Sequence, residues 1–151
     1  MTRRDARGVV RALRAAHQHD ADREGLLRMA CERIRGWGRP FTSVYAYMLD
    51  GDELTLEAHA GRETEHRRIA VGTGVCGTAV ATGADQNVPD VSRIGNYLAC
   101  NTFTKSELVV LIRRGNVILG QIDVDSDVPD GFGEAEHAAV KDVADALAVL
   151  L

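Results

Sequence analysis

The sequence predicts an α+β fold in which helices pack on one face of an antiparallel sheet. The chain begins with two helical patterns, continues as a run of short strands joined by glycine-containing turns, and ends in a third helical pattern. Its 151 residues, 45% of them hydrophobic, can bury one core without disulfide bonds. We therefore expect one domain over residues 1–151, with any ligand on the face that the helices leave open.

Residues 3–18 and 22–36 carry the periodicity of amphipathic helices. Asp22 precedes the second helix as a candidate N-cap. The apolar stripe of that helix consists of Leu27, Ala30, Cys31 and Ile34. A free cysteine in such a stripe behaves as a small hydrophobic residue, so we expect Cys31 to be buried and inert.

Charge is distributed unevenly along the chain. Residues 1–40 hold ten Arg against five acidic residues, whereas residues 41–151 hold eight basic residues against seventeen acidic ones. The first helix spaces its arginines along one face, at Arg4, Arg7, Arg11 and Arg14. A solvated helix face accounts for that spacing. Trp37 is the only aromatic residue before residue 41, so a base-stacking platform for nucleic acid is not indicated.

The middle of the chain begins with a predicted hairpin. Residues 42–50 are rich in β-branched and aromatic side chains, and residues 53–60 alternate apolar and polar side chains. Asp50-Gly51 suits the tight turn between them, because glycine tolerates the positive φ required there. Residues 67–71 predict a further short strand that leads into a glycine-rich segment.

The second half of the chain predicts more strands and a closing helix. Residues 86–91 indicate an edge strand or loop, because Pro89 cannot donate to a central ladder. Residues 91–105 are irregular, and loops of that length are usually functional or mobile. Residues 106–126 predict a hairpin around Gly115. The final helix, residues 133–151, is expected to bury Val140, Val143, Ala144, Leu147 and Leu150.

The strand "QIDVDS" places two carboxylates on one face of the sheet. Ile122 and Val124 point one way, and Asp123 and Asp125 point the other way. Carboxylates separated by about 7 Å repel each other and raise each other's pKa. Such a pair suits a cationic ligand, a metal or a proton donor, and an exposed polar strand end is the alternative.

Known metal-binding patterns fit the sequence poorly. "DVDSDVPDGFGE" spaces its acidic residues like a calcium loop, but Val128 takes the place of the glycine that the sharp turn needs. The segment before it predicts a strand, where a calcium loop follows a helix. The three cysteines do not form paired C-x-x-C zinc motifs. We therefore predict no metal and no cofactor.

Cys76 and Cys100 are candidates for chemistry. Cys76 follows the turn "GTGVCG" near the start of a short helical segment, where the helix dipole favours a thiolate. Cys100 lies in the irregular stretch, seven residues before Glu107. A buried, inert thiol is the alternative for each of them.

Four blocks occur in order over roughly residues 40–150: "RIAVGTGVCGTAVATG", "YLACNTFTKSELV", "LGQIDVDS" and "FGEAE". Together they resemble the GAF-domain free methionine-(R)-sulfoxide reductases. The resemblance implies one GAF domain, with residues 1–36 as N-terminal helices and residues 41–151 as sheet, site loop and C-terminal helix. That layout agrees with the α+β fold predicted from the pattern of elements.

The resemblance implies roles for particular residues. Cys100 matches the family's nucleophile, Cys76 matches a cysteine that can resolve it, and the acidic lining matches Glu107, Asp123 and Asp125. It implies that a Cys100 thiolate attacks the sulfoxide sulfur while a carboxylic acid protonates the departing oxygen. Methionine is released, the resulting sulfenic acid condenses with a second thiol, and thioredoxin reduces the disulfide. The carboxylates would bind the ammonium group of the free amino acid.

The chain departs from the family pattern around the substrate. Residues 65–67 (EHR) stand where many members carry a third cysteine. Ser43 or a neighbour stands at the place of the family's tryptophan, with Tyr45 and Tyr47 as the remaining aromatic residues. Tyr97 replaces a commoner histidine. We expect Tyr47 and Tyr97 to contact the substrate.

Other features bear on location and partners. No apolar run approaches the ~18–20 residues that a membrane-spanning helix needs, and the N-terminus lacks the apolar core of a secretory signal. An odd count of three cysteines argues against a secreted disulfide framework. We therefore expect a cytoplasmic protein with no membrane and no nucleic-acid partner, acting as a homodimer through its N-terminal helices.

Two other functions stay open from the sequence. A non-catalytic GAF module could bind a small ligand or sense redox state, because one fold hosts many functions. An adaptor that binds nucleic acid through the Arg-rich helices is a third reading, and it requires salt-dependent binding to generic DNA.

Overall fold

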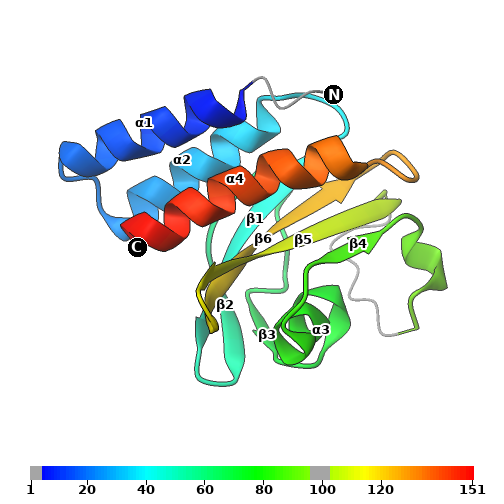
Figure 1. Ribbon diagram of the computed structural model, residues 1–151. Helices are drawn as coiled ribbons and strands as arrows, with labels where there is room; N and C mark the ends of the chain where they lie inside the picture. The colour runs from blue at the N-terminus through cyan, green and yellow to red at the C-terminus, as the bar shows by residue number, and fades with distance from the viewer. Residues whose placement is uncertain (1–4, 96–102) are drawn as a thin grey trace.

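The computed structural model describes residues 5–95 and 103–151 (Figure 1). Along the chain the elements are α1 (Ala6–Gln18), α2 (Arg23–Arg35), β1 (Ser43–Asp50), β2 (Glu53–Ala60), β3 (Arg68–Ala70), α3 (Gly74–Thr82), β4 (Gln86–Val88), the 3₁₀ turn η1 (Val91–Arg93), β5 (Ser106–Arg114), β6 (Val117–Ser126) and α4 (Glu134–Leu150). Each predicted strand and helix is present in the described part of the chain, and the strand expected over residues 67–71 is shorter than predicted.

The described strands form one sheet of six, in the spatial order β3-β2-β1-β6-β5-β4. Every neighbouring pair is antiparallel. β1 and β6 therefore occupy the centre, and β4 lies at an edge. β4 ends at Val88, immediately before Pro89, as expected for a residue that cannot donate a ladder hydrogen bond. The predicted α+β fold with an antiparallel sheet is confirmed.

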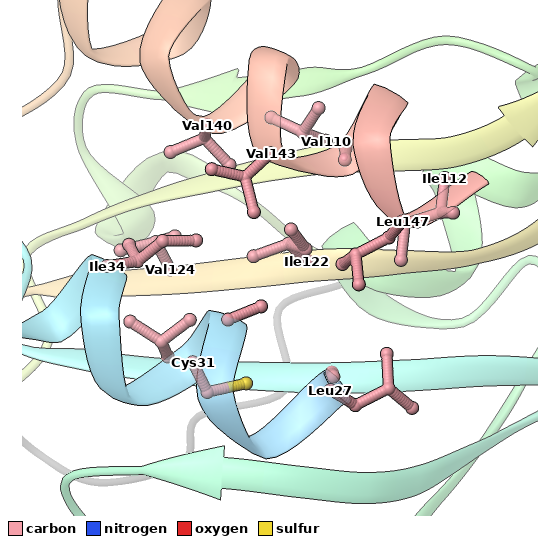
Figure 2. Close-up of a cluster of buried hydrophobic side chains, with 14 of the residues drawn as sticks. Leu27, Cys31, Ile34, Val110, Ile112, Ile122, Val124, Val140, Val143 and Leu147 are labelled. Carbon is pink, nitrogen blue, oxygen red and sulfur yellow. The ribbon is translucent and has the colours of Figure 1, made fainter. Parts of the chain in front are cut away.

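Helices α1, α2 and α4 form a layer over one face of the sheet (Figure 1). Figure 2 shows side chains of α2 and α4 meeting those of β5 and β6 in the main core, with Leu27, Cys31 and Ile34 from α2, Val140, Val143 and Leu147 from α4, and Val110, Ile112, Ile122 and Val124 from the strands. Burial of this apolar surface stabilises the fold by roughly 25 cal/mol per Å². None of the helices in the described ranges is long and apolar enough to span a bilayer.

Local signals in the sequence explain where several elements begin and turn. The Asp22 carboxylate accepts a hydrogen bond of 2.8 Å from the Gly25 N–H and so caps α2, as predicted. The two hairpin turns place Gly51 and Gly115 at φ of 66° and 61°, a region that favours glycine. Cys31 is 1% exposed, and burial raises the pKa of its thiol to about 12, so the prediction of a buried thiol is confirmed.

Helix α3 lies on the opposite face of the sheet (Figure 1). It packs closely because Gly77 has no side chain: a Cβ there would lie 2.5 Å from the Ala70 carbonyl oxygen and 2.9 Å from the Gly72 nitrogen. A second apolar cluster fills this side, with members that include Tyr45, Tyr47, Leu54, Ile69, Val75, Cys76, Ala79, Val109 and Leu111. The prediction that the N- and C-terminal helices cover one face holds for α1, α2 and α4. The short helix α3 additionally covers part of the other face.

Alternation along the central strands divides their side chains between the two faces. On β6, Ile122 and Val124 belong to the core beneath the helices. The intervening Asp123 therefore points to the α3 side, and so do its neighbours two residues away, Gln121 and Asp125. The polar side chains of β6 are thereby gathered at one place.

Candidate active site

Three acidic side chains converge on the α3 side of the sheet. Glu107 on β5 stands directly opposite Asp125 on β6, and Asp123 lies two residues before Asp125 on the same strand. Their exposed fractions are 4% for Glu107, 1% for Asp123 and 2% for Asp125. The alternative of a solvent-exposed polar strand end is therefore wrong, because these carboxylates are buried.

Cys76 meets the acidic side chains from the first turn of α3. Its Sγ lies 3.9 Å from Glu107 Oε2, within reach of a weak S–H···O contact. The Sγ of Cys76 and a carboxylate oxygen of each of Glu107 and Asp123 all lie within 4.8 Å of one another. The Gln121 side-chain amide donates a hydrogen bond of 3.0 Å to the Cys76 carbonyl oxygen and ties α3 to β6.

The electrostatics of the cluster favour protonated groups. Burial raises the pKa of the Cys76 thiol well above its ordinary value, and the negative charges of Asp123, Glu107 and Asp125 raise it further. The expectation of a Cys76 thiolate is therefore wrong: α3 does start near Cys76, but burial and neighbouring acids outweigh the helix dipole. Burial also raises the pKa of Asp123, while hydrogen bonds with Glu107 and Cys76 oppose the shift.

A pocket opens beside this cluster. It is lined by Tyr47, His66, Ile69, Thr73, Gly74, Val75, Cys76, Glu107 and Asp123. The Tyr47 hydroxyl donates a hydrogen bond of 2.7 Å to the His66 carbonyl oxygen, which fixes the aromatic ring as one wall. The pocket therefore combines apolar walls with a few convergent polar groups, as small-molecule sites do.

Arg62 forms a second cluster of contacts around the N-terminal end of β1. Its N–H donates to Ser43 Oγ at 3.0 Å, and its carbonyl accepts from the Tyr45 hydroxyl at 2.8 Å. Its guanidinium forms two hydrogen bonds of 2.7 Å with Asp127 and lies 5.1 Å from the centroid of the Phe103 ring. Ser43 thus supports this corner.

The predicted site residues that lie within the described ranges are on the α3 side of the sheet. Cys76, Glu107 and Asp123 lie together at the pocket, and Asp125 is the cross-strand neighbour of Glu107. Tyr47, expected to contact the substrate, lines the same pocket. Cys100 and Tyr97 lie outside the described residues.

Sequence reasoning missed two residues near the pocket, Gln121 and the backbone of His66. Gln121 is fully buried, and the Oε1 of its amide has no hydrogen-bond partner within the described ranges. The signal for Gln121 was present, since it precedes Asp123 by two residues and so shares its face. No comparable signal marked His66, because its carbonyl is positioned by the turn between β2 and β3.

Comparison with known proteins places the chain in a family. The GAF-domain family matches residues 20–151, and the chain belongs to that family. The free methionine-R-sulfoxide reductase of Escherichia coli (strain K12) is 36% identical over 95 residues, which are 63% of this chain and 57% of the relative. The chain therefore spans less than two thirds of that relative's length.

Solved structures show the same likeness in three dimensions. A structure of the type II free methionine-R-sulfoxide reductase from Thermoplasma acidophilum is 35% identical, with a TM-score of 0.78 over 82% of this chain and 87% of that chain. The X-ray structure of the Neisseria meningitidis free methionine-R-sulfoxide reductase in complex with its substrate is 27% identical, with a TM-score of 0.85 over 96% and 87% of the two chains. The predicted GAF-like fold is confirmed.

Proposed function

We propose that this protein reduces free methionine-(R)-sulfoxide to methionine. The observation that carries the proposal is the buried cluster of Cys76, Glu107 and Asp123 at a pocket on the α3 side of a GAF domain. Sulfoxide reduction by thiols needs cysteine sulfur and a proton donor for the departing oxygen, and a thiol beside carboxylic acids supplies both. The likeness to proteins named free methionine-R-sulfoxide reductase supports the same chemistry.

The proposed reaction runs in two steps on two cysteines. Cys100, outside the described residues, attacks the sulfoxide sulfur as a thiolate, and the oxygen passes to its sulfur. The methionine sulfur is reduced by two electrons, and Cys100 is oxidised to a sulfenic acid. Cys76 then attacks the sulfur of that sulfenic acid, its thiol proton passes to the departing hydroxyl, and a disulfide and water form. The raised pKa keeps Cys76 protonated in the first step, so it does not compete for the sulfoxide, and it must lose that proton as it attacks in the second step.

The acidic side chains divide two tasks in this proposal. Asp123 is the candidate proton donor, because burial raises its pKa and keeps the proton on the carboxyl. Glu107 and Asp125, paired across β5 and β6, hold the ammonium group of the free amino acid. Tyr47 and Tyr97 serve as walls for the methionine side chain.

The proposal includes the remaining parts of the cycle. A disulfide needs a dithiol reductant, and thioredoxin is the proposed one. Residues 1–151 act as a single domain, a homodimer is the proposed working form, and the cytoplasm, where thiols are kept reduced, is the proposed compartment.

The direct test is release of methionine from free L-methionine-(R)-sulfoxide with thioredoxin, thioredoxin reductase and NADPH. We expect turnover by the wild type and by Cys31→Ala, whose thiol lies in the core on the other side of the sheet. We expect none from Cys100→Ser, and a loss of about 10²–10⁴-fold from Asp123→Asn if it removes the acid. N-acetyl-methionine-(R)-sulfoxide lacks the ammonium group, so the wild type should not reduce it.

The outcomes separate this proposal from a ligand-binding or redox-sensing GAF module. No methionine release by the wild type, with thioredoxin or with dithiothreitol, would refute the reductase function. Turnover that survives Cys100→Ser would instead refute the assigned nucleophile. Equal turnover of the N-acetylated substrate would refute ammonium recognition by the carboxylates.

A further inference from the structure

The cluster of Cys76, Glu107 and Asp123 has the composition of a metal-ligand set. It offers one thiol sulfur and two carboxylate oxygens, and the three atoms lie within 4.8 Å of one another. All three residues are buried, with exposed fractions of 5%, 4% and 1%. The spacing of cysteines in the sequence gave no sign of this arrangement, because its donors come from α3, β5 and β6.

The separation of the Cys76 and Glu107 donor atoms is close to that of two ligands of a tetrahedral ion. With a metal–sulfur bond of about 2.3 Å and a metal–oxygen bond of about 2.0 Å, neighbouring sulfur and oxygen ligands of tetrahedral zinc lie about 3.5 Å apart. The distance from Cys76 Sγ to Glu107 Oε2 is 3.9 Å. A movement of a few tenths of an ångström by these side chains would close the difference.

One buried oxygen in the cluster lacks a hydrogen-bond partner. Within the described residues, no group donates a hydrogen bond to Asp123 Oδ1. The Asp123 side chain is only 1% exposed, and it lines the pocket. A buried, unpaired carboxylate oxygen is costly unless a proton or a cation meets it. This atom is therefore an independent indication that the cluster can accept a cation.

The protons in the cluster can be displaced by a cation. Asp123 interacts by hydrogen bonds with Glu107 and Cys76, which are acids themselves, so these hydrogen bonds require shared protons. A divalent ion compensates the same negative charge and releases those protons on binding. The ligand set selects among ions: thiolate sulfur disfavours Mg²⁺ and Ca²⁺ and favours zinc and similar thiophilic ions.

The geometry points to a Zn²⁺ site in the reduced protein, formed by Cys76 Sγ and one carboxylate oxygen each of Glu107 and Asp123. Three protein ligands would leave the fourth position of a tetrahedral ion for water or another small ligand, and all three residues line the pocket. A bound ion occupies Cys76, so it blocks disulfide formation by that thiol and competes with any ligand that uses the carboxylates of Glu107 and Asp123. Zinc is in this way a reversible inhibitor of whatever reaction uses the cluster.

The site is tested by titrating the reduced full chain with Co²⁺ alone, in a phosphine reductant, and following the near-ultraviolet band of a cobalt–thiolate bond. We expect one Co²⁺ per chain, release of protons to the buffer, and loss of the band when one equivalent of Zn²⁺ is added. Cys76→Ser should abolish the band. Asp123→Asn should weaken binding by about 100-fold or more, since even the loss of an outer-shell partner costs roughly 10–100-fold.

Matched variants identify the sulfur ligand. Cys31→Ala should retain the band, because Cys31 lies in the core beneath the helices. The absence of a thiolate band in the wild type would overturn the proposal, and so would a band that survives Cys76→Ser. If circular dichroism shows that Cys76→Ser is unfolded, Glu107→Gln replaces it, and unchanged Co²⁺ affinity in that variant is the refuting result. The titration needs no turnover, so it can succeed where the reductase proposal fails, and the reverse.

Discussion

Replacing Gly77 by alanine tests how closely α3 is pressed against the sheet. The new Cβ would lie 2.5 Å from the Ala70 carbonyl oxygen and 2.9 Å from the Gly72 nitrogen, where real Cβ atoms essentially never approach within 3.0 Å. Both neighbours are backbone atoms, so α3 must move outward. Because both approaches are under 3.0 Å and involve backbone, the overpacking cost belongs in the upper part of the usual range, about 2–3 kcal/mol, and alanine gains about 1 kcal/mol over glycine in a helix, so we expect a net loss of about 1–2 kcal/mol.

Urea denaturation followed by circular dichroism measures this loss. With a slope of about 1–3 kcal/mol per M, the midpoint should fall by roughly 0.3–2 M. Gly8→Ala is the matched control: it lies in α1, its added Cβ would have its nearest neighbour, the Arg11 side chain, at 4.0 Å, and it should raise stability by up to about 1 kcal/mol. Gly77→Ala as stable as the wild type would refute the argument, as would equal destabilisation by both substitutions.

Two further predictions concern charge and thiol reactivity. Hydrogen bonding to Arg62 lowers the pKa of Asp127, so the pair stabilises the fold above the unfolded pKa of about 3.9 and loses that effect as pH falls through the folded pKa. Because both side chains are 37% exposed, Asp127→Asn should lower the free energy of unfolding by less than about 1 kcal/mol at pH 7 and should not change it at strongly acid pH. Urea denaturation of both proteins at the two pH values measures this difference. In a Cys100→Ser background at pH 8, iodoacetamide should leave Cys31 and Cys76 unlabelled until the protein is denatured, since burial raises both thiol pKa values. Adducts on the folded chain, seen by intact mass, would contradict that reasoning.

Much of the fold follows from short-range signals. Period-2 alternation in "ELTLEAHA" and "QIDVDS" predicted strands, and glycine at Gly51 and Gly115 located the turns, because positive φ is a local requirement. Asp22 marked the start of α2 for the same reason. Strand order is not local: β1 and β2 form a hairpin that the sequence predicts, but the pairing of β1 with β6 depends on contacts between segments far apart in sequence.

The site was predictable in composition but less so in environment. The two aspartates of β6 could be assigned to one face from alternation alone. Their burial could not, because it depends on α3, which covers Asp123 from a different part of the chain. The same limit explains the wrong prediction of a Cys76 thiolate: the helix start was visible in the sequence, and the facing carboxylate of Glu107 was not.

Fold and site depend on one register. On β6, Ile122 and Val124 face the helices while Asp123 and Asp125 face α3, and β5 makes the same division between Leu108 and its neighbours. A slip by one residue would bring carboxylates beneath α4 and apolar side chains to the pocket. Unpaired charge in the core is strongly unfavourable, so the apolar core excludes the slipped register and thereby holds the acids at the pocket. The buried acidic cluster is thus stable because the other face of the same strands fixes where it lies.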